Sequence, residues 1–558
     1  MSDWSEGYMT EVDYTYGYYR HLNPLHMRLA MLSAGLTPPA VETACELGFG
    51  QGVTVNIHAA ASSVAWYGSD FNPGHAAFAN RLACVAGAAA RLTDESFAQY
   101  CNRPDLPDFD FIALHGIWSW ISDANRTGIV DFVRRKLKPG GVLCISYNTL
   151  HGWTAVLPLR DLLREHASRM SAPGLGMVSR VDAALAFADQ VLAVSPAYVK
   201  ANLELAKWLA EMKEEGRHYL AGEYFSDHWH PMSFADVARW LDAAKLSYGC
   251  SSKWTDHVEA MSLTRPQQSM LKSIADPIYR ETVRDVFVNQ AFRKEYWVKG
   301  LQPLGAEERA GALQAQRVAL VSPLAKVLVK AQTPSGEPIM SPEDFAPLVT
   351  ALGGHQPLSL AELALAVQPQ GMDFARLVQA VLLLASEGHL QMAQDEDAIS
   401  QARAAVLKLN LALMQKTRAG ADIDHLASPV TGGGIPVRRY HQLFLLARAE
   451  GRQTPEDWAR AAMRSLAAQG LRVTPESSPI VEPAENLEAL IRLARDEGKK
   501  DPEAWARGTL EFLQEFDRIP ARPTRPLLTL EDEVDELTAQ ASAFAEQRLP
   551  MLLALGVA

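Results

Sequence analysis

The stretch Val41-Glu42-Thr43-Ala44-Cys45-Glu46-Leu47-Gly48-Phe49-Gly50-Gln51-Gly52 decides the fold of this chain. It predicts an apolar strand that ends in an acidic residue, followed by three glycines at alternate positions and a helix from Val53. Such glycines let the backbone approach a ligand closely, and the N-terminus of the helix faces that ligand. A dinucleotide-binding loop would have its third glycine three residues after the second, at the position of Val53, so the spacing argues against that kind of loop.

The segment that contains this loop, residues 41–148, alternates short apolar runs with helical stretches, which predicts βαβ units and a parallel sheet. The expected strands are 41–47, 64–69, 109–114 and 142–147. A long helical stretch, 154–226, precedes two more expected strands at 246–253 and 257–263. We therefore expect an α/β fold, a Rossmann-like sheet with a helical insertion before its last strands.

After residue 264 the pattern is mainly helical. Residues 357–391 predict two amphipathic helices, and Gly388-His389-Leu390-Gln391-Met392 is compatible with the turn and wing of a winged-helix-like unit. Arg376 is the one basic residue on the second helix, 373–387, so we do not expect DNA recognition. Similar motifs at 446–460 and 493–507 predict two helical hairpins.

The expected domains follow from these changes of pattern. They are a ligand-binding core (1–153), a helical insertion that serves as a substrate lid (154–226), the completion of the sheet (227–265), a helical connector (266–335), a winged-helix-like domain (336–400) and a helical C-terminal domain (401–558). Because domains usually hold ~100 to 200 residues, a chain of 558 residues calls for several of them.

The composition limits the possible partners. The 53 Lys and Arg residues stand against 65 Asp and Glu residues, a formal net charge of -12, so the chain is not drawn to nucleic acids or anionic membranes and suits a basic partner better. No apolar stretch reaches the ~20 residues that span a bilayer, and the first nineteen residues hold no Lys or Arg. The five cysteines are widely spaced, as in reduced proteins. We expect a cytoplasmic protein with no membrane insertion and no nucleic-acid partner.

Polar residues follow each expected strand of the core. The carboxyl ends of parallel strands meet at one edge of a sheet, where ligands bind. There Asp70 would accept ribose hydroxyls with Phe71 against an adenine ring, and Asp94 would read the exocyclic amine of the base. The candidate binding residues are Glu46, Gly48, Gly50, Gly52, Asp70, Phe71, Asp94, Ser96, Phe97, His115 and Gly116.

These features, in this order, resemble the class I S-adenosylmethionine-dependent methyltransferases. Four further motifs resemble those methyltransferases that carry a methyltransferase regulatory domain, a family that includes the outer-membrane-protein lysine methyltransferases of bacteria. They are Tyr14-x-x-Gly17-Tyr18-Tyr19-Arg20-x-Leu22-Asn23-Pro24, Trp118-Ser119-Trp120, Ser146-Tyr147-Asn148-Thr149-Leu150-His151-Gly152-Trp153 and Leu426-Ala427-Ser428-Pro429-Val430-Thr431-Gly432. The resemblance implies S-adenosyl-L-methionine as methyl donor, S-adenosyl-L-homocysteine as product and a lysine-bearing protein as acceptor. The chain departs from the pattern at His151, where the family has Pro.

Methyl transfer from a sulfonium is an in-line displacement that needs alignment and no metal. A lysine must first lose its proton, and aromatic faces hold the cation while polar atoms orient the free amine. The resemblance and the strand-end positions imply two sets of residues. Those expected in catalysis are Tyr147, Asn148, His115 and His151, and those expected to line the acceptor site are Tyr18, Tyr19, Trp118, Trp120, Trp153 and Tyr224. His228-x-His230 has no apparent third ligand, so no metal site is expected.

Two other functions remain open. The first alternative is a small-molecule O- or N-methyltransferase whose helical domains form a homodimer. The second is a regulatory protein that senses S-adenosylmethionine without transferring its methyl group. A helical appendage of ~290 residues is more than a small acceptor requires, which favours a protein acceptor. The intact acidic residue, glycines and Asp70 argue against a sensor.

Overall fold

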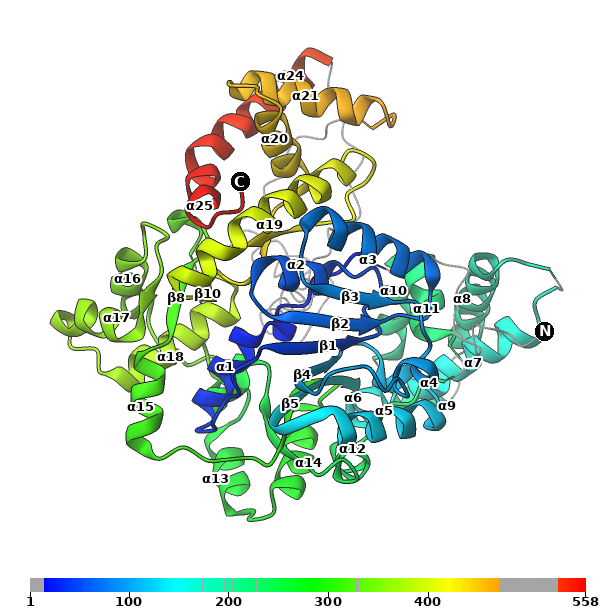
Figure 1. Ribbon diagram of the computed structural model, residues 1–558. Coiled ribbons are helices and arrows are strands. Elements are labelled where there is room, and N and C mark those ends of the chain that lie inside the picture. Colours follow the sequence, from blue (N-terminus) through cyan, green and yellow to red (C-terminus); the bar gives the residue numbers. More distant parts are fainter. Residues whose placement is uncertain are drawn as a thin grey trace. The chain divides into compact units, whose positions relative to one another are not determined.

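The computed structural model describes residues 15–471 and 530–558, apart from 173, 195–196, 203, 227, 328 and 330. Its main sheet has seven strands (Figure 1). They are β1 (Thr43–Leu47), β2 (Ala65–Ser69), β3 (Ala90–Thr93), β4 (Phe109–Leu114), β5 (Leu137–Asn148), β6 (Leu246–Ser251) and β7 (Phe292–Lys299). Their order is β3-β2-β1-β4-β5-β7-β6, with β7 antiparallel to both neighbours and the other pairings parallel. The predicted Rossmann-like sheet is confirmed.

Helices cover both faces of this sheet because alternate residues of each strand point to opposite sides. On one face Cys144 belongs to an apolar core that includes side chains of α1, α2 and α3. On the other, Ile145 belongs to a second core with side chains of α5 and α12. The helices of the two layers are α1 (Pro24–Ser33), α2 (Val53–Ala61), α3 (Pro73–Ala86), α5 (Asp123–Lys136) and α12 (Phe234–Asp242).

The chain divides into two compact units. The first comprises Met1–Leu413, Ala421–Val437 and Pro550–Ala558, and the second comprises Met414–Gly420 and Arg438–Leu549. The first unit contains the main sheet and all the candidate site residues. In the part of the chain that the structure describes, no helix is both long and apolar enough to pass through a bilayer.

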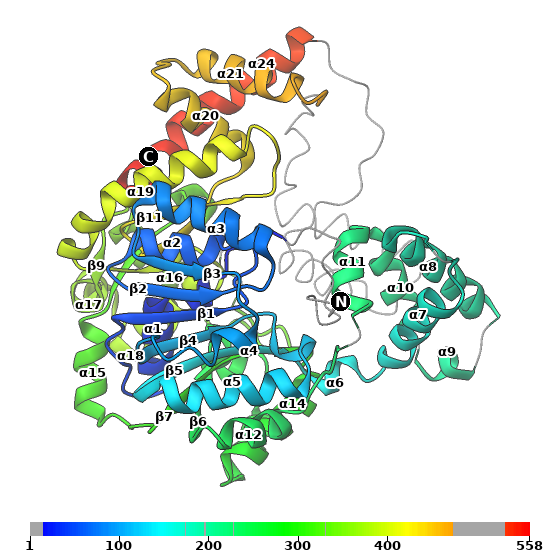
Figure 2. The same cartoon turned by 45° about the vertical axis from the view of Figure 1, so that its right-hand side comes forward.

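The predicted helical insertion is confirmed and has a core of its own, built from residues such as Leu163, Leu185 and Leu209. In Figure 2 it stands beside the sheet, and α11 lies on the side of the insertion that faces the carboxyl ends of β1 to β3. Its helices are α6 (Leu150–Trp153), α7 (Leu157–Arg169), α8 (Met177–Ala193), α9 (Ala197–Ala201), α10 (Leu205–Glu214) and α11 (Arg217–Tyr224).

The last strand of the sheet is not where the sequence predicted it. Residues 257–263 form no strand. They contain the end of the 3-10 helix η3 (Trp254–His257) and the whole of η4 (Glu259–Met261). Val258 is the one β-branched residue in this segment, so its preference for a strand is weak. The missing strand is β7, in the segment predicted as a helical connector. The prediction of strands depended on runs of apolar residues, and Arg293, Lys294 and Glu295 interrupt such a run in β7. The sheet is therefore completed at residue 299 and not at 265.

A second, three-stranded sheet has the order β10-β8-β9 and lies in the segment predicted as a winged-helix-like unit. Gly388 turns with φ +80° as expected, but β10 then pairs with the upstream β8 and not with a following strand, so the predicted wing is wrong. Its strands are β8 (Arg317–Leu320), β9 (Leu358–Ser359) and β10 (Leu390–Ala393), and the helices near it are α15 (Ala306–Gln314), α16 (Pro342–Ala351), α17 (Leu360–Val367) and α18 (Phe374–Ser386). Helices α13 (Arg265–Ser273) and α14 (Pro277–Val288) lie instead beside the main sheet, where α14 packs against α12.

The segment after α19 (Glu396–Lys416) returns to the main sheet as a hairpin of β11 (His425–Ser428) and β12 (Gly433–Pro436). The Asn23 side chain donates to the Thr431 carbonyl at 3.1 Å, and Gln394 donates to the carbonyls of Ala61 in α2 and Pro429 in the hairpin. Arg20 donates to the Ala385 and Ser386 carbonyls at the end of α18. Two motifs that lie about 400 residues apart in sequence thus meet on α2.

The second unit contains the first of the two predicted helical hairpins. Helix α20 (Arg439–Ala449) ends before Gly451, which has φ +90°, and Thr454 caps the helix α21 (Pro455–Ala467) through the backbone N–H of Asp457. The other hairpin, 493–507, lies outside the described residues. The described residues from 530 onward form α24 (Leu530–Ala543), the π-helical turn η7 (Phe544–Arg548) and α25 (Leu549–Ala554), and the chain belongs to the first unit again from Pro550.

Candidate active site

The glycine loop after β1 has a backbone that side chains would not tolerate. Gly48, Gly50 and Gly52 have φ values of +70°, +57° and +70°, in the left-handed region that favours glycine. A Cβ atom on Gly48 would lie 2.3 Å from the Cδ1 atom of Ile117, and one on Gly52 would lie 2.5 Å from the Cβ atom of Ala79. The path of the loop therefore requires all three glycines, and its packing requires Gly48 and Gly52 as well.

Asp70, after β2, holds this loop in place. One carboxylate oxygen accepts the Gly50 N–H at 2.8 Å, and the other accepts the Asn72 N–H at 3.1 Å and lies 3.0 Å from Nδ1 of His75. A carboxylate oxygen can accept two hydrogen bonds, so the oxygen at Gly50 keeps one acceptor site for a ligand hydroxyl. This geometry suits the expected contact with ribose.

Glu46, at the end of β1, is a buried acid that lacks a donor. Its side chain is 3% exposed, and Oε2 has no hydrogen-bond partner among the described residues. Burial, and secondly the charge of Asp70, raise the pKa of Glu46 to about 8. A buried carboxylate without a partner is costly, so this position fits a ligand that brings a cationic or hydrogen-bonding group.

The other expected cofactor residues lie beside this loop. Phe71 follows β2, and Asp94 is exposed after β3. Ser96 caps α4 (Phe97–Tyr100) by accepting the Gln99 N–H, and the Phe97 ring comes within 3.7 Å of the position of a Cβ atom on Gly48. The structure gathers these residues near the strand ends, and their contacts with adenine stay a prediction.

We expect Asp70→Ala to weaken the binding of S-adenosylmethionine by ~1 to 3 kcal/mol, about the cost of removing a hydrogen-bonding group from a buried site. Isothermal calorimetry on the folded variant measures this change. Asp108→Ala is the matched control, because Asp108 precedes β4 at the opposite end of the strands. An unchanged dissociation constant in Asp70→Ala would remove Asp70 from the cofactor site.

A polar cluster follows β4 and β5. Ser146 accepts the Gly116 N–H at 2.9 Å, and its hydroxyl lies 2.9 Å from Nδ1 of His115. The same Nδ1 lies 2.9 Å from Nε2 of His21. Since the Ser146 oxygen already accepts from Gly116, we assign its hydroxyl as the donor to Nδ1 of His115 and place the His115 proton on Nε2. Burial, and secondly Lys294, lower the pKa of His115 to about 3, so the ring is neutral and a weak base near pH 7.

Tyr19 covers this cluster, and its role in lining the acceptor site stays a prediction. Its ring centroid lies 3.9 Å from that of His115, and its backbone N–H donates to Oγ1 of Thr54 in the first turn of α2. The sequence prediction missed His21 and Ser146. Both lie inside motifs that were recognised, but nothing local in the sequence shows that these two side chains meet at His115.

Strand alternation separates two residues that were both expected in catalysis. Asn148 and Ser146 lie on one face of β5. The side chain of Asn148 makes no hydrogen bond to another described residue. Tyr147 lies on the opposite face, fully buried, and its hydroxyl donates to Glu295 at 3.1 Å. The prediction of Tyr147 as a catalytic residue is therefore wrong, because a strand exposes only every second side chain to one pocket.

Two aromatic residues expected at the acceptor site lie elsewhere. Trp118 is fully buried in the core under α5 and α12, with its ring 6.0 Å from that of Trp240. Tyr18 lies between α2 and the hairpin: its hydroxyl is 3.1 Å from Nε2 of His58, and its ring is 4.9 Å from that of His425. Both predictions are wrong, because the rings fill gaps between elements that the sequence does not show to be neighbours. Trp120 is half-buried after β4 and stays a prediction.

Trp153 and Tyr224 are brought together by the insertion. Their ring centroids lie 6.0 Å apart, and Trp153 also packs 5.0 Å from Trp229. Trp208 completes this aromatic cluster, 5.5 Å from Tyr224 and 6.4 Å from Trp153. The cluster joins α6, α10 and α11, so it forms the base of the insertion where the chain leaves the sheet.

His151 does not join the His115 cluster. Its imidazole interacts electrostatically with Asp285 of α14, a carboxylate bound to Arg293 on the Tyr147 side of the sheet. The structure thus does not support His151 as a base beside Asn148. Among the described residues, no group of three His, Cys, Asp or Glu side chains could hold a metal ion.

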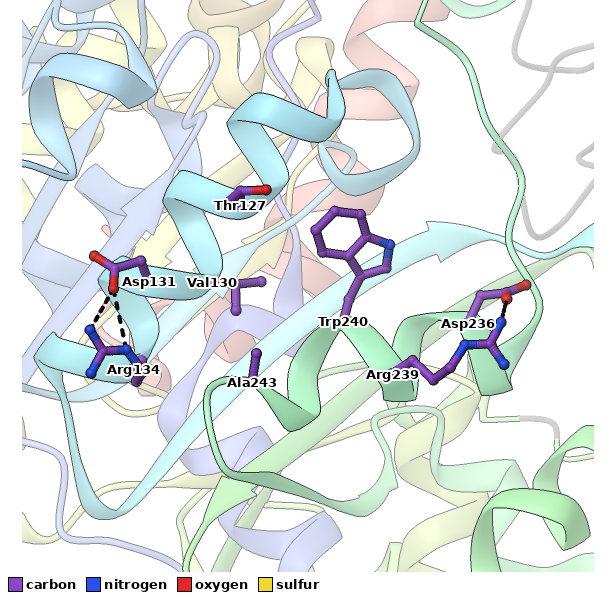
Figure 3. Close-up of a pocket in the computed structure, with 8 residues that line it drawn as sticks. All are labelled: Thr127, Val130, Asp131, Arg134, Asp236, Arg239, Trp240 and Ala243. Carbon is purple, nitrogen blue, oxygen red and sulfur yellow. Dashed lines mark hydrogen bonds and ion pairs between the residues drawn. The ribbon is translucent and has the colours of Figure 1, made fainter.

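A surface groove of about 480 Å³ lies away from these residues, between α5 and α12 (Figure 3). Each of its arginines is held by a neighbouring acid, Arg134 by Asp131 at 2.6 Å and Arg239 by Asp236. The groove lies on the helical layer and not at the strand ends, so it takes no part in the site. Its lining residues are Thr127, Val130, Asp131, Arg134, Asp236, Arg239, Trp240 and Ala243.

The strand order, the antiparallel β7 and the glycine loop define the fold of a class I S-adenosylmethionine-dependent methyltransferase. The structure of PKMT2 from Rickettsia typhi in complex with AdoHcy has the same fold, with a TM-score of 0.62 over 98% of this chain and 100% of that one at 14% identity. Another structure of that PKMT2 gives a TM-score of 0.58 at 17% identity, over 82% of this chain and 92% of the other.

Residues 216–299 match the model of the predicted methyltransferase regulatory domain. This segment comprises the helices α11 to α14 and the strands β6 and β7, so the domain completes the main sheet. The uncharacterized protein sll1526 of Synechocystis is 38% identical to this chain over 492 residues, which are 87% of this chain and 96% of the relative. The chain belongs to the family of sll1526 and carries the methyltransferase regulatory domain.

Proposed function

We propose that this protein transfers a methyl group from S-adenosylmethionine to the side-chain amine of lysine in a protein acceptor. The observation that carries the proposal is that two features lie together at the strand ends. One is the glycine loop with Glu46 and Asp70, and the other is the polar cluster of His115 and Ser146 beside Tyr19. The resemblance to bacterial lysine methyltransferases supports the choice of acceptor. The five cysteines are free thiols, which supports the expected cytoplasmic location.

The residues of the cofactor edge fit S-adenosylmethionine. The unpartnered Oε2 of Glu46 would accept a hydrogen bond from its cationic amino acid part, and Asp70 would accept from its ribose. When bound, the cofactor supplies a methyl group on a sulfonium, which requires no metal. The left-handed backbone of Gly48 and Gly50 turns the loop sharply at the end of β1, where the cofactor would bind.

The main obstacle for a lysine acceptor is its charge. With a pKa of ~10.4, only about one lysine in 2,500 is a free amine at pH 7, a cost of roughly 4.6 kcal/mol. A site that removes water from the ammonium lowers its pKa, since burial disfavours the charged form. The ring of Tyr19 and the neutral ring of His115 would provide such surroundings.

Asn148 and His115 then have distinct roles. The amide oxygen of Asn148 would accept an N–H of the acceptor and direct the nitrogen lone pair toward the methyl group. His115 is a poor general base because of its low pKa, so we assign it to orientation, fixed through Ser146 and His21. The proton that the lysine ammonium loses before methyl transfer leaves to water.

The proposal is tested by incubating the purified protein with radiolabelled S-adenosylmethionine and a cell lysate. The lysate comes from a strain that lacks this protein. Label in protein bands, recovered as methyl-lysine after hydrolysis, is the expected result. Label confined to the small-molecule fraction would instead establish a small-molecule methyltransferase. Cofactor binding without transfer to either fraction would establish a sensor.

A further inference from the structure

One acidic residue of the insertion, Glu223, shares its helix with a tyrosine that interacts with Tyr19, the residue that covers the polar cluster. Tyr19 packs on His115, and the phenol of Tyr19 interacts electrostatically with that of Tyr219 in α11. Glu223 lies four residues after Tyr219, so the two side chains share one face of α11. The face of α11 that carries Tyr219 and Glu223 is therefore the one turned toward Tyr19. Figure 2 shows α11 on the side of the insertion toward the carboxyl ends of the strands.

Glu223 differs from the other acids near it. It is only partly exposed and has no hydrogen-bonding or ionic partner among the described residues. Glu211 is paired with Lys207 at 3.8 Å, and Glu214 is exposed at the end of α10. Burial raises the pKa of Glu223 to about 7, which is the behaviour of a carboxylate that lacks a compensating cation.

The neighbours of Glu223 suit an alkylammonium group. Its charge interacts with the phenols of Tyr219 and Tyr224, and Tyr224 belongs to the aromatic cluster with Trp153 and Trp208. A carboxylate together with aromatic faces binds a cation by charge and by cation–π attraction, and the rings also cover the methylene groups of a lysine. A neutral acceptor would leave the carboxylate without a partner.

We propose that Glu223 binds the ammonium group of the acceptor lysine as it enters the site and so makes the enzyme specific for cationic acceptors. This inference rests on the proposed function. It assigns specificity to the first helix of the methyltransferase regulatory domain segment, which begins at residue 216. The cofactor residues Glu46 and Asp70 lie on the strand ends and are not part of this contact.

Glu223→Gln tests the inference, because it keeps the size of the side chain and removes its charge. Initial rates of protein labelling are measured over a range of lysate protein, with saturating radiolabelled S-adenosylmethionine. We expect kcat/KM for labelled protein to fall about 10- to 100-fold, mainly through KM, the usual effect of losing a hydrogen bond to a charged group. The dissociation constant of S-adenosylmethionine should change by less than about twofold.

Two further variants separate specificity from structure. Glu223→Asp should recover part of the lost rate, since it restores the charge, whereas Glu214→Gln removes an exposed acid of the same insertion and should behave as the wild type. If Glu223→Gln labels protein with the wild-type KM, the inference is wrong while the proposed function stands. If the wild-type enzyme labels no lysine in protein, the proposed function is wrong and the inference falls with it.

Discussion

Arg293→Ala should lower the free energy of unfolding by about 3 to 5 kcal/mol, the usual cost of removing one partner from a buried ion pair. The Arg293 guanidinium lies 4.3 Å above the ring of Phe234 and is bound to three acids, Glu281 at 2.6 Å and also Asp285 and Glu295. Its loss would leave these carboxylates without their cation. Asp285 and Glu295 are 0% and 1% exposed.

Urea denaturation at neutral pH measures this effect. Arg239→Ala is the matched control, because Arg239 is 74% exposed in its pair with Asp236 and should change stability by less than about 1 kcal/mol. The deficit of Arg293→Ala should shrink at low pH, where the three acids become protonated. A loss as small as that of the control would show that the buried network does not hold β7 to α14.

Glu46→Gln should make the cofactor-free protein more stable near pH 8 while weakening its affinity for S-adenosylmethionine. The pKa of Glu46 is raised from 4.5 to about 8, so the folded state keeps its proton where the unfolded state has lost it. Stability therefore falls as pH rises from 4.5 through 8, by at most about 4 to 5 kcal/mol. Glutamine carries no charge at any pH and removes this fall.

Thermal or urea unfolding at pH 5 and pH 8 measures the first effect, and calorimetry measures the second. Glu42→Gln is the control, since Glu42 precedes the same strand but is exposed. We expect the stability difference between the two pH values to be smaller in Glu46→Gln than in the wild type, with cofactor binding weaker by about 1 to 3 kcal/mol. Unchanged cofactor affinity would show that the buried Oε2 is not a ligand contact.

The edge of the sheet that we propose for the cofactor was largely predictable as a structure because its signals are local. Each polar residue follows an apolar run, and parallel strands bring their carboxyl ends together whatever their order. Gly48, Gly50 and Gly52 could be identified because a loop with positive φ leaves few alternatives to glycine. Asp70 was identified in the same way, although its bond to Gly50 was not.

The acceptor side was predictable only in part. Tyr147 and Asn148 are adjacent in sequence, but strand alternation sends one to Glu295 and leaves the other beside Ser146. Strand β7 escaped prediction because its charged residues are buried in pairs, and an apolar pattern cannot reveal a charge that finds its partner on another element.

By itself, the sequence determined the class of fold, the glycine loop and the order of the polar residues at the strand ends, because these depend on neighbours within a few positions. Only the tertiary structure decided which aromatic rings fill the core, and it joined the motif at Asn23 to that at Thr431. It also placed Glu223 on the helix that faces Tyr19. Such contacts depend on packing between elements that lie hundreds of residues apart in sequence. The hydrophobic periodicity of a segment predicts its secondary structure and its buried face, but not the distant element that packs on that face.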